Sequence, residues 1–148
     1  MQLRGLYASI DAQSVLEHSA EVMRRRVLSR AVVAAIDASP ILGVRVGDRS
    51  DHRFTGIWPV VVEGRVFGRS WKQATNGWFR TALEDPRATI QVGDRKVRVR
   101  IAQVRSERIR DAVERAYAEK YATPGSRKFV RGFRTERRRA ATVEFVPR

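Results

Sequence analysis

A chain of 148 residues, 43% of them apolar, is long enough for one domain with a sizeable hydrophobic core. Its 30 Lys and Arg against 16 Asp and Glu give a formal net charge of +14, which indicates an anionic partner or a surface kept basic for solubility. The chain has no Cys, which excludes disulfides, thiolate metal sites and a Cys nucleophile.

The first 40 residues are predicted to be a helical N-terminal segment. Apolar residues recur at three-and-four spacing over residues 11–37, but three consecutive arginines at 24–26 interrupt the stripe. Ser29 is a suitable cap for a second, shorter helix, so the pattern allows one helix or two. We expect this segment and a core over residues 41–148 to form a single domain, 1–148. No apolar run is long enough for a secretory signal or a membrane span, so we expect a cytoplasmic protein with no membrane partner.

From residue 41 onward the apolar period changes toward two. This predicts strands over residues 41–46, 57–62, 65–71, 88–92, 96–104 and 140–146. Pro59 lies inside the second strand and so places it at an edge or a bulge. Glu63-Gly64 and Gly93-Asp94 are suitable hairpin turns. Helices are predicted over residues 76–84, capped by Asn76, and over residues 106–121, which together indicate a small α+β barrel or sandwich.

The stretch "FGRSWKQATNGWF", residues 67–79, combines aromatic rings with cations and small polar groups. Alternation along a strand would place Gly68, Ser70 and Lys72 on one face, so that Gly68 opens space for a flat ring. A hydroxyl, an ammonium and the free N–H groups of a helix starting near Asn76 would then hold a phosphate. Alternation turns Arg69 away from this face unless a bulge intervenes. The alternative interpretation is that the aromatic residues are core and the cations are solvated.

With this stretch in place, the passage "IWPVVVEGRVFGRSWKQATNGWFRTALEDPRATIQVGDRKVRVRIAQV" resembles the core of the flavin- and deazaflavin-binding split barrels. That superfamily includes the pyridoxamine-phosphate oxidases and the deazaflavin-dependent nitroreductases. The motifs "FGRSW", "GWFRTAL", "AYAEKY" and "RRAATVEFVPR" are similar to those of a bacterial family known as a domain of unknown function and grouped with these barrels. The likeness covers about residues 41–148 and leaves the helical N-terminus outside.

The resemblance implies an antiparallel Greek-key split β-barrel with flanking helices, forming a homodimer with cofactors at the subunit interface. It implies FMN or a deazaflavin as cofactor, with the phosphate held by Ser70 and Lys72, and by Arg69 with less support. Trp78 corresponds to an aromatic residue that lies near the cofactor in the deazaflavin group. The basic signature is sparser than in true pyridoxamine-phosphate oxidases, and some split barrels bind no cofactor. The family itself has no assigned activity.

Two further basic regions support a different interpretation, a nucleic-acid-binding module. One is the outer face of the strand over residues 96–104; the other is the Arg-rich stretch 126–139, in which Phe129 and Phe133 are interleaved. For the cations on the strand, protection of a sheet edge is the favoured interpretation. The candidate nucleic-acid contacts are Arg98, Arg100, Arg127, Lys128, Arg131 and Arg134.

The two histidines, His18 and His52, do not lie in any spaced set of metal ligands, so no metal site is expected. Three functions are therefore predicted. The first is a flavin or deazaflavin nucleotide binder of the split-barrel class, acting as an oxidoreductase. The second is the nucleic-acid-binding module, and the third is a cofactor-free homodimer with a structural or regulatory role.

Overall fold

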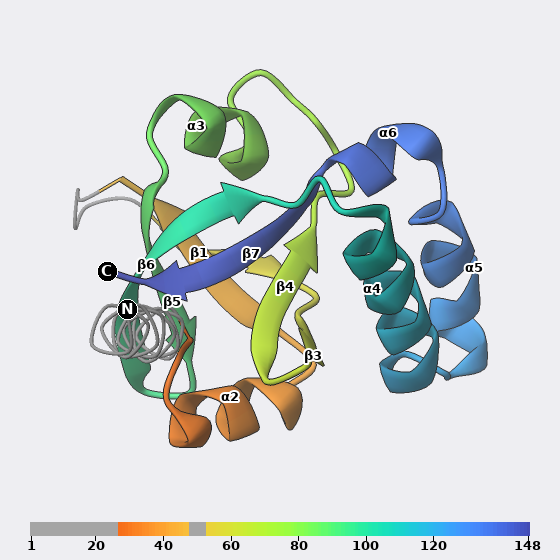
Figure 1. The fold of residues 1–148 in the computed structure, drawn as a ribbon, viewed down its shortest axis with the longest axis horizontal. Helices are drawn as coiled ribbons and strands as arrows, with labels where there is room; N and C mark the ends of the chain where they lie inside the picture. The colour runs from red at the N-terminus through yellow and green to blue at the C-terminus, as the bar shows by residue number, and fades with distance from the viewer. Residues whose placement is uncertain (1–26, 48–52) are drawn as a thin grey trace, which may run out of the picture.

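A computed structural model of the protein describes residues 27–47 and 53–148 (Figure 1). In this part of the chain a seven-stranded, wholly antiparallel sheet curls into a half-barrel in the order β2-β1-β5-β6-β7-β4-β3. The strands are β1 (Leu42–Val46), β2 (Thr55–Ile57), β3 (Val60–Val62), β4 (Arg65–Arg69), β5 (Arg87–Val92), β6 (Arg95–Gln103) and β7 (Thr142–Pro147). The predicted α+β split barrel is confirmed.

Helices cover both ends and one side of this sheet (Figure 1). They are α2 (Arg30–Asp37), α3 (Trp78–Glu84), α4 (Glu107–Lys120), α5 (Pro124–Gly132) and α6 (Glu136–Ala140). In the view of Figure 1, α2 lies below the barrel, α3 lies above it, and α4, α5 and α6 gather beside β3 and β4. None of the helices in the described residues is long and apolar enough to cross a membrane.

The helix at residues 30–37 is a separate helix with its own cap. Its N-cap is Ser29, whose hydroxyl oxygen accepts a hydrogen bond from the backbone N–H of Val32 at 3.3 Å. Residues 30–37 therefore form a helix of their own, one of the two alternatives that the interrupted apolar stripe allowed. The rest of the predicted N-terminal helix, together with His18 and His52, lies outside the described residues.

The single strand predicted over residues 57–62 is wrong. It is two strands, β2 and β3, separated by Trp58-Pro59, because proline has no N–H to continue a ladder. These two consecutive strands lie at opposite edges of the sheet. The two edges of the curled sheet are therefore joined by the chain itself at residues 58–59.

Two tyrosines hold this junction: Tyr117, within α4, and Tyr121, the residue directly after α4. The Tyr117 hydroxyl donates to the carbonyl of Trp58 at 2.7 Å. The Tyr121 hydroxyl shares its one proton between the carbonyls of Pro40 at 2.9 Å and Pro59 at 3.1 Å. Burial raises the pKa of both tyrosines, so their hydroxyls stay protonated and remain donors.

Both predicted hairpin turns are confirmed. Glu63 and Gly64 have φ of 54° and 72°, the left-handed conformations that a tight turn between β3 and β4 requires. Gly93 has φ of 59° at the turn between β5 and β6, where a residue with a side chain would be strained.

The core consists of two apolar clusters, one inside the half-barrel and one between the sheet and the helices α4 and α5. Alternation along β4 divides its residues between them: Val66 points inward, while Phe67 packs against the helical side with Val113 and Tyr117. Residues of β4 thus belong to both clusters, and the chain directly after β4 lines a cleft.

Candidate functional site

An aromatic cleft of about 540 Å³ lies where β2, the chain after β4 and helix α5 meet. Three tryptophans and two phenylalanines contribute to its wall, and residues near the start of α3 close one side. The lining residues are Ile41, Thr55, Gly56, Ile57, Trp58, Arg69, Ser70, Trp71, Lys72, Ala74, Asn76, Gly77, Trp78, Phe129 and Phe133. Most of the residues predicted to bind a cofactor are therefore brought together, and no carboxylate is among the described residues that line the cleft.

Ser70 lies in this wall but does not project as predicted. The strand β4 ends at Arg69, so the alternation that paired Ser70 with Lys72 stops before either residue. Ser70 is 1% exposed, and its hydroxyl donates to the carbonyl of Lys72 at 2.6 Å. A carbonyl can only accept, so the Ser70 proton is committed within the loop, and the prediction that it donates to a phosphate is corrected.

Lys72 is exposed, and it forms no ion pair with any described residue. Asn76 is also exposed, but it does not cap α3 as predicted: the N-cap is Gly77, with no side-chain hydrogen bond. Trp78, the first residue of α3, is half-buried and lines the cleft. The positive charge at this cleft therefore comes from the Lys72 ammonium.

Gly68 does not open the site to a ring. It points into the half-barrel, where a Cβ built on it would lie 2.7 Å from Cδ1 of Ile57 and 3.1 Å from Cε2 of Phe145. The protein's own core side chains fill the space that the glycine leaves, and Gly68 is not among the lining residues of the cleft. The predicted role of Gly68 is corrected: it allows Ile57 and Phe145 to pack closely.

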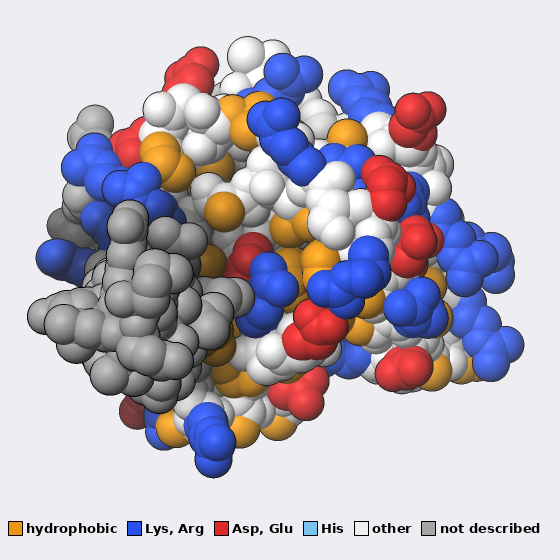
Figure 2. Space-filling model, viewed as in Figure 1, with side chains coloured by type: hydrophobic (Ala, Val, Ile, Leu, Met, Phe, Trp, Pro, Cys, Tyr) orange, Lys and Arg blue, Asp and Glu red, His pale blue; other side chains and the backbone are white. Residues whose placement is uncertain are grey.

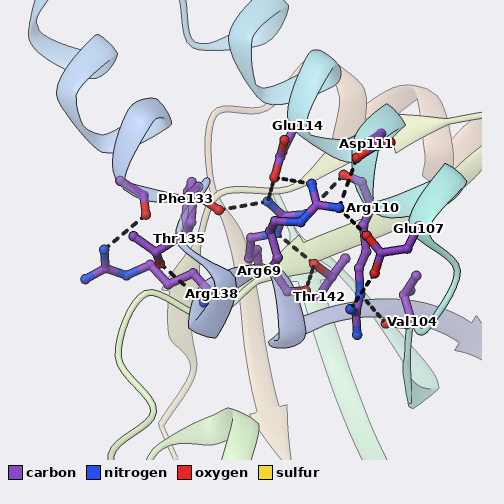
Figure 3. A network of polar contacts seen from close by, with 12 residues as sticks. Arg69, Val104, Glu107, Arg110, Asp111, Glu114, Phe133, Thr135, Arg138 and Thr142 are labelled. Carbon is purple, nitrogen blue, oxygen red and sulfur yellow. Dashed lines mark hydrogen bonds and ion pairs between the residues drawn. The ribbon is translucent and has the colours of Figure 1, made fainter.

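Arg69 borders the cleft, but its side chain has no exposed surface. Its Nε donates to Thr142 Oγ1 at 2.7 Å, and the guanidinium also donates to Glu114 Oε1 at 3.1 Å and to two backbone carbonyls, those of Phe133 and Arg110 (Figure 3). Burial lowers the pKa of Arg69, and Glu114 partly offsets this effect. The guanidinium thus joins β4 to β7, α4 and α5, and its predicted contact with a phosphate is corrected.

Arg139 extends this network along α4. It makes ion pairs with Glu114 at 2.6 Å, Glu107 at 2.6 Å and Asp111 at 2.9 Å. Hydrogen bonding to Glu114 raises the pKa of Arg139, while Arg139 keeps the pKa of Glu107 below its usual value. Arg139, the last cation of the Arg-rich stretch 126–139, is therefore structural, because it fastens α6 to α4.

Arg138 performs a similar role on the other side of α6. Its guanidinium lies 3.6 Å from the centre of the Trp71 ring and donates to the carbonyls of Trp71 at 2.9 Å and Gly132 at 3.1 Å. Trp71 also packs edge-on against Phe133 and against Gly132, where a Cβ would collide with the indole. This tryptophan is consequently held by both α5 and α6.

Trp58 is a cleft residue that the sequence analysis missed, because it was placed within a strand. Its ring stacks on Tyr121 with centroids 4.2 Å apart and an interplanar angle of 3°. The only local signal was Pro59 beside it, which breaks the strand and so frees the preceding residue to turn toward the cleft.

The candidate nucleic-acid contacts lie in two separate places, on β6 and on or just after α5. Arg98 and Arg100 are exposed on β6, which pairs with both β5 and β7, so the interpretation of these cations as edge protection is wrong. The others are exposed on or just after α5, which packs on α4: Arg127, Lys128, Arg131 and Arg134. Figure 2 shows acidic and basic side chains interspersed over α4, while Lys and Arg occupy the right-hand rim over α5.

Metal-ligating chemistry is absent from the part of the chain that the structure describes. No group of three or more His, Cys, Asp or Glu residues there could hold a metal ion. The chemistry of the site is therefore that of an aromatic cleft with an ammonium at its rim.

A curled, wholly antiparallel half-barrel sheet flanked by helices is the fold of the split-barrel proteins. Within this class, a family model matches residues 32–145, and the chain belongs to that family, the uncharacterized proteins conserved in bacteria designated DUF2255. The match includes α2 and so begins somewhat before the region of the resemblance seen in the sequence. A search of curated proteins finds no match.

Solved structures share the fold at low sequence identity. An F420-H2 dependent reductase, FDR-A, is 19% identical with a TM-score of 0.51, over 81% of this chain and 96% of its own. The FAD and heme binding protein of Mycobacterium smegmatis is 15% identical with a TM-score of 0.53, over 82% and 67%. A NimC/NimA family protein of Clostridium acetobutylicum is 10% identical with a TM-score of 0.54, over 78% and 80%. At these identities the comparisons establish the fold.

Proposed function

We propose that this protein binds a flat, phosphate-bearing cofactor, FMN or a deazaflavin, in the aromatic cleft and acts as an oxidoreductase. The observation that carries the proposal is the meeting of Trp58, Trp71 and Trp78 around one cleft with Lys72 at its rim. The cleft volume of about 540 Å³ lies within the range of roughly 300–1,000 Å³ typical of small-molecule sites. Proteins of the same fold that are described as F420-H2 dependent or FAD-binding add support.

The residues present fit such a group, with an anchor set that keeps Lys72, Asn76 and Trp78 from the prediction and adds Trp58. Trp58 and Trp78 offer apolar ring surface, and the Lys72 ammonium is the anion-binding group because it has no ion pair among the described residues. The exposed Asn76 amide adds a hydrogen-bond donor on the same wall. Ser70 acts indirectly, since its bond to the Lys72 carbonyl fixes the backbone from which the lysine projects.

A flavin or deazaflavin supplies hydride chemistry when bound, and the protein supplies binding, orientation and exclusion of water. No residue of the cleft is assigned a catalytic proton transfer. Ile41 and Phe129, which line the cleft, are 47% and 40% exposed. We expect a second copy of the chain to cover this apolar rim, giving the homodimer that the resemblance implies; light scattering of the purified protein measures this directly.

Binding of FMN and riboflavin to the native protein and to Lys72→Gln tests the proposal. We expect Lys72→Gln to weaken FMN binding about tenfold, the equivalent of about 1.4 kcal/mol, and to leave riboflavin binding unchanged, because riboflavin has no phosphate. Lys128→Gln is the matched control, since Lys128 is exposed on α5 and is not among the residues that line the cleft.

Thermal denaturation gives an independent measure. A ligand at one hundred times its dissociation constant stabilises the native state by about 2.7 kcal/mol. For a chain of this length that shift is about 5–11 °C in melting temperature. A protein that is colourless as purified, and that neither FMN nor a deazaflavin stabilises, would contradict the proposal.

A further inference from the structure

A second hollow of about 560 Å³ adjoins the aromatic cleft on the far side of Trp71 and Lys72. Its lining residues are Trp71, Lys72, Gln73, Ala74, Thr135, Arg137 and Arg138. Trp71, Lys72 and Ala74 line both spaces, so a ligand in the cleft can continue past Lys72 without leaving the protein surface. The two hollows have different chemistry, because the first is largely aromatic and the second is basic.

The positive charge of the second hollow is not neutralised by its lining. No carboxylate is among the described residues that line it. Arg138 is committed to the carbonyls of Trp71 and Gly132. Arg137, by contrast, is exposed and makes no ion pair with a described residue, as is also true of Lys72.

Thr135 adds a neutral donor to the same wall. Its hydroxyl oxygen accepts the backbone N–H of Arg138 at 3.4 Å as the N-cap of α6, which leaves the hydroxyl proton available to a ligand. A hydroxyl that lines the same hollow as Lys72 and Arg137 suits an anionic oxygen group, since hydrogen bonds from charged donors to phosphate or carboxylate are among the strongest in proteins.

We propose that this hollow is a subsite for the anionic tail of the ligand in the cleft, with Arg137 as its main anchor and Thr135 as a second donor. This inference rests on the proposed function and deepens it: the preferred ligand carries a further phosphate or carboxylate beyond the one at Lys72. A cofactor with an extended anionic tail, such as a dinucleotide flavin or a tailed deazaflavin, therefore binds more tightly than a mononucleotide.

Equilibrium binding of riboflavin, FMN and FAD to the native protein, to Arg137→Gln and to Arg134→Gln tests this order. We expect FAD to bind more tightly than FMN, and Arg137→Gln to weaken FAD binding about five- to tenfold while leaving riboflavin unchanged. Arg134→Gln is the control, because Arg134 is an exposed neighbour outside the lining of either hollow. Equal affinities for FMN and FAD, unaffected by Arg137→Gln, overturn the subsite and leave the cleft proposal intact.

Inorganic pyrophosphate separates the two proposals. It has no ring, so its binding reports on the cations and not on ring packing in the cleft, and calorimetry of the native protein and of Arg137→Gln measures the part that depends on the basic hollow. We expect pyrophosphate to bind the native protein, to bind Arg137→Gln more weakly, and to compete with FAD more than with riboflavin. If no flavin binds but pyrophosphate binds through Arg137, the anion subsite stands and the flavin proposal is wrong; if pyrophosphate does not bind, the subsite is wrong.

Discussion

Replacing Arg69 by methionine removes the charge at the centre of the buried network and keeps a long apolar side chain in its place. The substitution deletes the hydrogen bonds to Thr142, Glu114 and the Phe133 and Arg110 carbonyls, while the Thr142 hydroxyl still donates to the Arg139 carbonyl at 2.6 Å. We expect the variant to fold with reduced stability, because β4 loses its polar connections to β7, α4 and α5.

The size of the loss follows from what each partner retains. Removing one member of a buried ion pair costs about 3–5 kcal/mol when the other charge is left unpaired. Glu114 keeps its 2.6 Å bond to Arg139, so this cost does not arise. The buried Thr142 Oγ1 and the Phe133 carbonyl each lose a charged donor, which costs about 1–3 kcal/mol per group, and we expect a loss of about 3 kcal/mol in all. At this chain length that loss lowers the melting temperature by about 6–12 °C.

Urea denaturation and thermal melting followed by circular dichroism measure the effect, with Arg134→Met as the matched control. Arg134 is exposed and without an ion pair among the described residues, so its replacement is expected to change stability by less than about 0.5 kcal/mol. An Arg69→Met variant as stable as the control would refute the view that Arg69 is a structural residue. The guanidinium of the native Arg69 would then be available as the anion contact that the sequence suggested.

Two further expectations concern packing and pH. Gly132→Ala places a methyl group against the Trp71 ring, and we expect a loss of about 1–3 kcal/mol together with a changed near-UV spectrum; Gly125→Ala, where nothing lies within 4 Å, should instead be neutral or stabilising by up to about 1 kcal/mol. Arg139 lowers the pKa of Glu107 below its ordinary value of 4.5, so this pair's contribution is complete above pH 4.5 and is lost as the pH falls through the lower folded-state value. The melting temperature should therefore fall more steeply below pH 4.5 in the native protein than in Glu107→Gln, and identical profiles would contradict this assignment.

Local sequence patterns predicted the elements that local interactions determine. Both hairpin turns could be predicted from the sequence because Gly64 and Gly93 occupy turn positions that require positive φ. The helix α4 could be predicted because apolar residues, among them the buried Ile109, recur on one of its faces. Ser106, where the predicted helix began, is its N-cap. The order of these elements, with the motifs of residues 67–79, was also sufficient to indicate the family.

The site was harder to predict because its details depend on partners distant in sequence and on where strands end. Alternation paired Ser70 with Lys72, but it has no meaning beyond Arg69, where β4 stops. The partners of Arg69, which include Glu114 and Thr142, lie 45 and 73 positions away, so no local pattern could show that its charge was already used. The space beside Gly68 is filled by Ile57 of β2 and Phe145 of β7, and these contacts between distant parts of the chain leave no local pattern either.

The junction at Trp58-Pro59 places the connection between the two edges of the sheet in the wall of the cleft. The two edges of the sheet are connected there by the chain itself and by the hydrogen bonds from Tyr117 and Tyr121, and not by a ladder of hydrogen bonds between neighbouring strands. A ligand that packs on Trp58 therefore contacts the segment that joins the two edges of the sheet, so we expect binding in the cleft to stabilise the barrel as a whole.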